Sequence, residues 1–221
     1  MIGWFTDPYP DELLYSACAR FHERTQYSNK KFTLLRLFGT TNSTAIIDFP
    51  CRLRSFIAAL PPCHSYSDDK LINEQTLLPF FSAFLPCERV SQLREDMKGN
   101  GGLTIHRRLG VMASRITTPI WLRFCPLCRE ADRSHYGETY WHRLHQLSGV
   151  LVCPIHNVFL ENSHARRNSA RDILRFVAAD DALPAQYLDP SDSTHRILLM
   201  LARDAAWLFE HPNEIRPQCF I

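Results

Sequence analysis

The chain has 221 residues, of which 45% are hydrophobic and 22% are charged, and its formal net charge is +2. This length suffices for one large domain or two small ones, and the composition is that of an ordinary globular protein. There is no apolar run of the roughly eighteen residues that a membrane helix needs, and no N-terminal secretory signal pattern. We therefore expect neither membrane association nor secretion, and the eight scattered cysteines favour a reducing compartment.

Positive charge is concentrated in the middle of the chain. Between Lys98 and His145 there are eight lysines and arginines against three acidic residues. Four arginines follow between Arg166 and Arg175, against one aspartate. Arginine-rich stretches suit phosphate groups, although a solvated surface explains the same pattern.

The first half of the chain predicts a series of helices. One begins near Asp11, where acidic residues favour a helix start, and carries an apolar stripe of Leu13, Ala17 and Phe21 at helical spacing. Further helical stretches are predicted over 29–39, 48–62, 69–85, 87–102 and 103–115. Within 69–85, Pro79 is expected to end or kink the helix.

The sequence changes character near Thr117. The stretches 117–124 and 149–152 are rich in β-branched and aromatic residues, as short strands would be, and each runs into a cysteine. We expect a helical segment over 137–147, a short outgoing strand over 157–161, and helices over 169–180 and 193–211.

These elements predict a mostly α protein with small β elements. We expect a helical, helix-turn-helix-like N-terminal region over 1–116 and a zinc-finger module of zinc-ribbon type over 117–162. C-terminal helices would occupy 163–221, which can be the start of a longer chain.

Two Cys-Pro-x-Cys/His turns predict a metal site. Two ligands separated by two residues share one tight turn. The four ligands of a tetrahedral zinc can therefore come from two such pairs, Cys125 with Cys128 and Cys153 with His156. A catalytic zinc keeps a position open for water, and a base deaminase needs a His-x-Glu that this chain lacks. The pattern therefore predicts a structural zinc (Zn2+) and no catalytic residue.

Two histidines between these turns are alternatives. His142 and His145 are three residues apart and would share one helix face. One of them can replace His156 as a ligand or hydrogen-bond a thiolate. Packing beside Trp141 is the simpler explanation for both.

The segment around the metal ligands resembles the TniQ/TnsD family of transposon target-site selectors. The matching positions there are Cys125, Pro126, Cys128, Tyr136, Gly137, Glu138, Trp141, Cys153, Pro154, His156 and Leu160. The opening of the chain is also similar to that of the family, at Pro8, Tyr9, Glu12, Leu13, Tyr15 and Ser16. The resemblance covers approximately residues 7–162.

The resemblance implies a non-enzymatic protein of the bacterial cytoplasm, associated with the nucleoid. Such a protein binds double-stranded attachment-site DNA and recruits the AAA+ ATPase TnsC, which activates transposition with TnsA and TnsB. The predicted phosphate contacts are Arg107, Arg108, Arg115, Arg123, Arg129, Arg133, Arg143, Arg166, Arg167 and Arg171. The predicted TnsC contacts are residues expected on the outside of the N-terminal helix: Trp4, Tyr9, Glu12 and Arg20.

Two other functions are compatible with parts of this pattern. In CRISPR-associated relatives, a TniQ protein is an adaptor that links a guide-RNA effector complex to TnsC without reading DNA sequence itself. A zinc hydrolase or nuclease would need an open metal position beside an acidic residue, which four good ligands do not leave.

Overall fold

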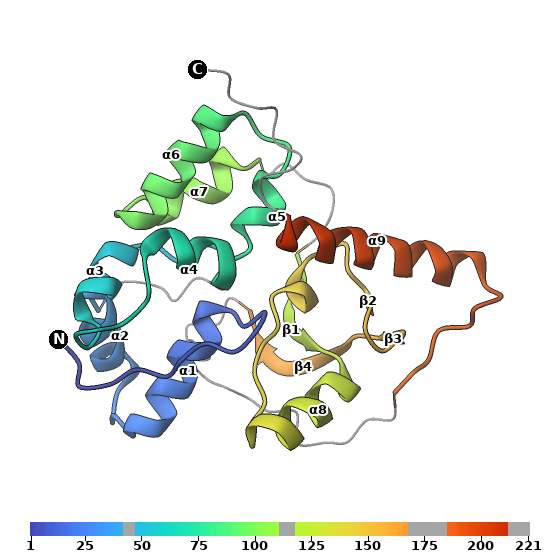
Figure 1. Cartoon of the computed structure of the whole chain (residues 1–221), viewed down its shortest axis with the longest axis horizontal. Helices are drawn as coiled ribbons and strands as arrows, with labels where there is room; N and C mark the ends of the chain where they lie inside the picture. Colours follow the sequence, from blue (N-terminus) through green and yellow to red (C-terminus); the bar gives the residue numbers. More distant parts are fainter. Residues whose placement is uncertain (42–46, 111–117, 168–184, 212–221) are drawn as a thin grey trace.

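The computed structural model describes residues 1–41, 47–110, 118–167 and 185–211 (Figure 1). The part before residue 118 is helical. Its helices are α1 (Leu14–Thr25), α2 (Lys30–Phe38), α3 (Leu53–Ala59), α4 (Asp68–Gln75), α5 (Leu78–Ser82), α6 (Cys87–Lys98) and α7 (Gly102–Arg108).

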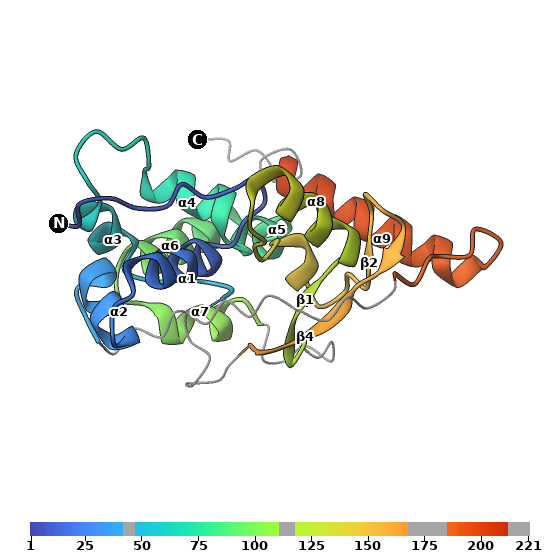
Figure 2. The same ribbon diagram turned by 90° about the horizontal axis from the view of Figure 1, so that it is seen from below.

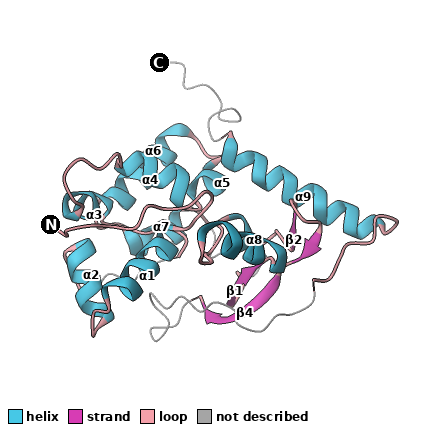
Figure 3. Ribbon diagram, turned by 60° about the horizontal axis from the view of Figure 1, so that its bottom comes forward, coloured by secondary structure: helices cyan, strands magenta, loops and turns pink. Residues whose placement is uncertain are grey.

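The part after residue 117 mixes short strands with two helices. Its elements are β1 (Trp121–Phe124), α8 (Pro126–Tyr136), the 3-10 helix η2 (Leu144–Gln146), β2 (Val152–Cys153), β3 (Val158–Phe159), β4 (Glu161–Arg166) and α9 (Ser193–Glu210). Strand β1 pairs antiparallel with β4, and β2 pairs antiparallel with β3. Figure 3 shows how small these strands are beside the helices, so the predicted fold class is confirmed.

The helices and the strand-containing part lie side by side. In Figures 1 and 2, α1 to α7 occupy one side of the molecule, and β1, β4 and α8 the other. Helix α9 packs against α5 and β2. One apolar core runs through all of these parts, with Leu13 and Phe56 from the first, Leu122 from β1 and Ala205 from α9. The predicted division of the chain into the regions 1–116, 117–162 and 163–221 therefore remains a prediction.

Local capping explains where several helices begin and end. The side chain of Asn29 accepts a hydrogen bond from the Lys31 amide at the start of α2, and Gly39 ends this helix with a φ of 69°. The stretch predicted as one helix over 69–85 is two helices, α4 and α5. The break falls at Thr76, which has extended backbone, before Pro79 begins the first turn of α5.

Two sequence-based expectations are wrong in the strand-containing part. The stretch 137–147, expected to be helical, contains only the short 3-10 helix η2. The α-helix of this region is α8, which Pro126 begins and Gly137, with a φ of 77°, ends. Residues 161–166 form strand β4, where a change to helix was expected. The stretch 169–180 and the end of the stretch 103–115 lie outside the described residues.

Among the described helices, none combines the length and apolarity that crossing a membrane requires.

Candidate metal centre

The first pair of ligands is held by the start of α8. Cys125 is the residue before the helix, and its sulfur accepts a hydrogen bond from the Cys128 amide at 3.4 Å. Pro126 fits the first helical turn because that position needs no amide hydrogen. This cap turns the Cys125 and Cys128 sulfurs toward the same point.

The second pair is held by the turn between β2 and β3. Cys153 ends β2 and pairs with Val158 in the ladder. The Asn157 amide donates to the Cys153 carbonyl at 2.9 Å, and Asn157 has a φ of 53°, which asparagine tolerates better than most residues. The tight turn places His156 beside the sulfur of Cys153.

The four ligand atoms form a cluster of tetrahedral dimensions. They lie within 4.8 Å of one another. A tetrahedral zinc with Zn–S bonds of about 2.3 Å and a Zn–N bond of about 2.0 Å needs S···S edges of about 3.8 Å and S···N edges of about 3.5 Å. The Cys128 and Cys153 sulfurs are 3.7 Å apart, and His156 Nδ1 is 3.6, 3.3 and 3.7 Å from the sulfurs of Cys125, Cys128 and Cys153. The cluster can hold a metal ion, with Nδ1 as the nitrogen ligand.

The surroundings of the sulfurs favour a bound cation. Cys125, Cys128 and Cys153 are buried, and Val158 completes their small apolar cluster. The neighbouring thiols of Cys125 and Cys153, together with burial, raise the pKa of Cys128. Three thiolates so close together would repel one another, so all three ionise only around a cation.

The two alternative histidines do not coordinate with this cluster. His142 is held by Asp132, with Nε2 at 2.8 Å from Oδ2, and lies 3.8 Å from Asp11. His145 is buried, and its Nε2 is 4.0 Å from the Cys128 sulfur, which is a contact with the thiolate. The four-residue group that could hold a metal contains His156 and does not include His145. Of the two predicted roles, metal ligand or hydrogen-bond partner of a thiolate, the second therefore fits His145.

A partly buried polar cluster joins the metal-binding part to the N-terminal helices. Arg20 donates to both carboxylate oxygens of Glu12, at 3.0 and 2.7 Å, and to Glu138 at 2.9 Å. The Tyr9 hydroxyl donates to the same Glu138 oxygen at 2.7 Å, and Arg24 pairs with it too. We call Tyr9, Glu12, Arg20, Arg24 and Glu138 the seam. Its members come from both halves of the TniQ/TnsD-like pattern, which are more than a hundred residues apart in sequence.

The seam corrects two expected positions. Glu12 is fully buried and Arg20 is 2% exposed, so neither lies on the outer side of the N-terminal helix as expected. Arg20 also lies over the Tyr9 ring, which packs against Tyr136, 4.2 Å away between ring centroids. Trp4 remains accessible, with 44% of its surface exposed.

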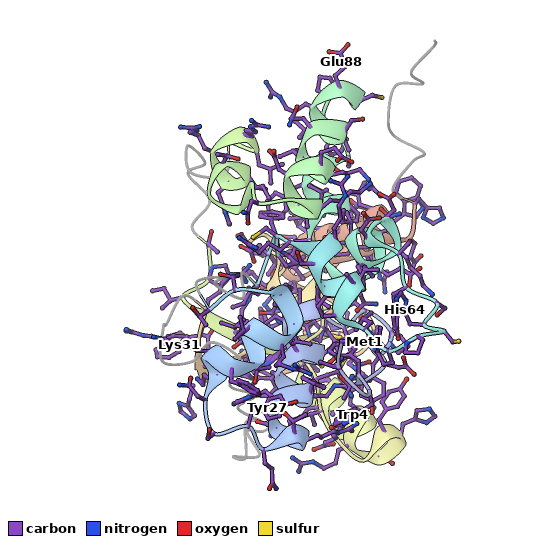
Figure 4. All side chains as sticks on the ribbon, turned by 90° about the vertical axis from the view of Figure 1, so that its left-hand side faces the viewer. Met1, Trp4, Tyr27, Lys31, His64 and Glu88 are labelled. Carbon is purple, nitrogen blue, oxygen red and sulfur yellow. The ribbon has the colours of Figure 1, made fainter. Side chains whose placement is uncertain are left out.

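Exposed aromatic and apolar residues of α2 were missed by the sequence reasoning. Phe32 and Leu35 are each 45% exposed. Ring contacts connect Trp4 to Phe21, Phe21 to Tyr27 and Tyr27 to Phe32. In Figure 4, Trp4 and Tyr27 lie on the same side of the molecule. We call Trp4, Tyr27, Phe32 and Leu35 the aromatic patch. Helical periodicity alone gave no signal for it, because an apolar residue on a helix is expected to face inward.

The predicted phosphate contacts separate into two groups and a remainder. The buried ones, each at most 9% exposed, are Arg123, Arg129, Arg143 and Arg167. The exposed ones are Arg107, Arg108, Arg133 and Arg166. Arg115 and Arg171 lie outside the described residues.

Two of the buried arginines, Arg143 and Arg167, have acidic partners. Arg143 donates to the Asp11 carboxylate and to the carbonyl oxygens of Asn73 and Thr76. Arg167 pairs with Asp48 and donates to a backbone carbonyl. Their expected placement on a basic face is therefore wrong, because burial with hydrogen-bond acceptors holds them inside.

Comparison with known proteins identifies relatives of the chain. The family model described as TniQ matches residues 4–160. The transposon Tn7 transposition protein TnsD of Escherichia coli is 30% identical over 156 residues, which are 71% of this chain and 31% of that protein. The chain thus spans about a third of the length of this curated relative.

Proposed function

The chain belongs to the TniQ/TnsD family, and we propose that it is a non-enzymatic target-site selector of a transposon. In this role it binds attachment-site DNA and recruits the AAA+ regulator TnsC. The observation that carries the proposal is the family match, which spans both the helical region and the metal cluster. Because the matched residues cover only 31% of the longer relative, the activity of the whole relative is a proposal for this chain.

We propose that zinc fills the cluster of Cys125, Cys128, Cys153 and His156 and has a structural role. Three sulfurs and one nitrogen occupy all four positions of a tetrahedron, so none is left for a water nucleophile. A cobalt-substituted protein should therefore show the absorption of a closed site with three sulfur ligands and one nitrogen ligand. A spectrum of higher coordination that responds to added small anions would indicate an open, reactive site.

We propose that the aromatic patch is the part of the helical region that meets TnsC. Large exposed aromatic side chains are typical centres of protein interfaces, and Trp4 and Phe32 expose almost half of their surface. Glu12 and Arg20, which were expected to contact TnsC, are buried and bonded to each other in the seam. We therefore assign the TnsC contact to the exposed residues of the aromatic patch.

Capture of purified TnsC tests this assignment. We expect Trp4→Ala combined with Phe32→Ala to weaken capture about tenfold or more, as loss of interface centres does. Phe84→Ala is the matched control, because Phe84 is an aromatic residue that is 73% exposed outside the patch. Equal capture by the double variant and the control would remove the patch from the TnsC interface.

We propose that DNA contacts come from the exposed arginines. Four phosphate contacts would make the logarithm of the affinity fall with the logarithm of salt concentration with a slope of about −3 to −4. Arg133 and Arg166 have exposed side chains, so their substitution by alanine should reduce this slope without unfolding the protein. A slope near zero on the attachment-site duplex would contradict direct DNA binding.

The adaptor function is the second candidate, and the burial of four predicted phosphate contacts favours it. An adaptor would bind TnsC without DNA and would give no sequence-specific shift of a DNA duplex on its own. Capture of TnsC without DNA, measured beside a gel shift without TnsC, separates the two functions. A specific gel shift by the chain alone would favour the selector.

A further inference from the structure

One face of the β1–β4 pair is open and carries a recess. Burial alternates along β4, where Ser163 and Ala165 face the core and Asn162, His164 and Arg166 are exposed. In the ladder, Trp121 of β1 is opposite Arg166, and Arg123 is opposite Asn162. A cavity of about 520 Å³ lies on this side, lined by Trp121, Arg123, Asn162 and the residues before β1.

The recess holds a charged group that the described residues do not neutralise. Arg123 is 5% exposed and lines the cavity. Its guanidinium donates to the Leu147 carbonyl, while its Nε has no partner and no carboxylate pairs with it in the described part of the chain. A buried cation without a counter-charge is costly, so a ligand that brings an oxyanion would be stabilised there.

Other positive charges reinforce this preference. The nearby charge of Arg167 adds to burial in lowering the pKa of Arg123 to about 10, which still leaves Arg123 charged at neutral pH. Arg166 lies over the Trp121 ring, 5.1 Å from its centroid. Neither strand has an acidic side chain on this face.

The walls of the recess combine apolar and polar side chains. Ile120 and Leu151, both among its lining residues, are 66% and 45% exposed, and Trp121 and Leu160 add further apolar surface. A phosphodiester would have to bring its flanking sugars into the recess to reach a guanidinium that is 95% buried. A side-chain carboxylate on a flexible peptide reaches such a site more easily, and arginine binds carboxylates with two parallel hydrogen bonds.

We propose that this recess binds a short acidic and apolar segment of a partner protein, with a carboxylate of the segment at Arg123 and its apolar side chains against Trp121, Ile120 and Leu151. Asn162 and Ser148 line the same cavity and supply neutral hydrogen-bonding groups for the segment. The recess shares no residue with the aromatic patch. The proposal is therefore independent of the TnsC contact proposed above. Arg166 is common to this face and to the proposed DNA contacts, and the competition with duplex DNA described below distinguishes the two.

Selection from a phage-displayed library of random linear peptides tests the proposal on the full zinc-loaded chain. We expect the enriched peptides to carry Asp or Glu beside Leu, Ile, Val or Phe. The strongest of them is then synthesised, and its affinity for variants is measured by fluorescence anisotropy. Enrichment of peptides without acidic residues would overturn the proposal, as would a failure to enrich any peptide.

Two substitutions at one exposed position separate charge from contact. Ile120→Glu and Ile120→Lys both remove the apolar side chain, at a site exposed enough to leave the fold intact. An acidic ligand should bind the lysine variant about tenfold more tightly than the glutamate variant, because like charges disfavour a complex. Equal affinities would contradict the proposal.

Three further variants locate the bound peptide. Trp121→Ala and Arg123→Gln should each weaken binding about tenfold or more, as interface centres do. Arg89→Ala, which removes an exposed arginine of α6 outside the recess, should leave it unchanged. Because Arg123→Gln changes a buried residue, the zinc content and circular dichroism of this variant are checked first. If the variant misfolds, the comparison of Ile120→Glu with Ile120→Lys decides the proposal. Displacement of the peptide by a duplex oligonucleotide would assign the recess to nucleic acid instead and overturn the proposal.

Discussion

The helical region and the metal-binding part are stabilised in different ways. Helices α1 to α5 bury large apolar side chains, such as Phe21, Phe56 and Leu78, each at most 1% exposed. Around the metal ligands, the cluster of buried residues consists of three cysteines and Val158, while residues such as Leu122 and Val152 join the main core. Apolar packing therefore stabilises both parts, and the second part adds a local centre built from the metal ligands.

The difference shows what each part needs from the other. Strands β2 and β3 have two residues each, too few to be stable by themselves. A metal ion bound by Cys153 and His156 would fix them locally, while the seam joins Glu138, just after α8, to Arg20 of α1. Removing the metal, the core or the seam should therefore have separable effects.

Metal removal should have the largest effect. Structural zinc contributes about 10–16 kcal/mol in zinc-finger peptides at neutral pH. We expect a chelator, or Cys153→Ser, to abolish the near-UV circular dichroism that Trp121 and Trp141 contribute and to leave much of the far-UV helical signal. Cys63→Ser is the matched control, because Cys63 is exposed and outside the cluster. Unchanged near-UV dichroism after complete loss of zinc would contradict the comparison.

A core substitution in the helices should rank next. Phe56 is fully buried and contacts the rings of Phe5 and Phe38. Phe56→Ala should lower the free energy of unfolding by about 3–5 kcal/mol, because it removes apolar contacts and leaves a cavity. Urea unfolding measures this change, and the variant should still bind one zinc. Loss of zinc binding by the folded variant would show that the two parts are not separable.

Breaking the seam should cost somewhat less. Arg20→Met leaves the carboxylate of Glu12 buried without its partner, which should lower the free energy of unfolding by about 3 kcal/mol. Arg54→Met is the control, because the Arg54–Glu95 pair is more than half exposed and its loss should change the free energy of unfolding far less. Similar losses in both variants would mean that the seam is no more than a surface ion pair.

The smallest effect concerns pH. Burial lowers the pKa of His142, but its contacts with Asp11 and Asp132 outweigh burial and raise this pKa to about 9. Protonated His142 therefore stabilises the fold fully below its unfolded pKa of about 6.5, and this stabilisation is lost as pH rises through 9. Unfolding titrations from pH 6 to pH 10 should show this decline in the wild type and a smaller one in His142→Gln. The same decline in both proteins would assign it to other groups.

The sequence predicted what depends on neighbouring residues. The ligand pairs Cys125/Cys128 and Cys153/His156 are three residues apart, so a local turn brings each pair together. The N-terminal helix with Leu13, Ala17 and Phe21 buried also follows from local spacing.

Features that depend on distant contacts were not predictable in this way. From the sequence, Arg143 was expected to be a surface cation. Its carboxylate partner is Asp11, which lies 132 positions earlier in the chain, so local spacing could not reveal the pair. Trp4 was expected to be accessible near the start of the chain, but Phe32 was not, since exposure depends on which helices pack around α2. The helix α8 was not predicted because its first residues, Cys125 to Cys128, were interpreted only as metal ligands. In the structure the Cys125 sulfur also caps the start of this helix.

Glu138 also sets the order in which the chain can mature during its synthesis. The oxygen that accepts from Tyr9 belongs to a residue made 129 positions later. At a synthesis rate of about 5–20 residues per second, this delay is about 6–26 s. During that interval Arg20 has only Glu12 as its carboxylate partner within the seam, so the N-terminal helices reach their final contacts only once the metal-binding segment has left the ribosome.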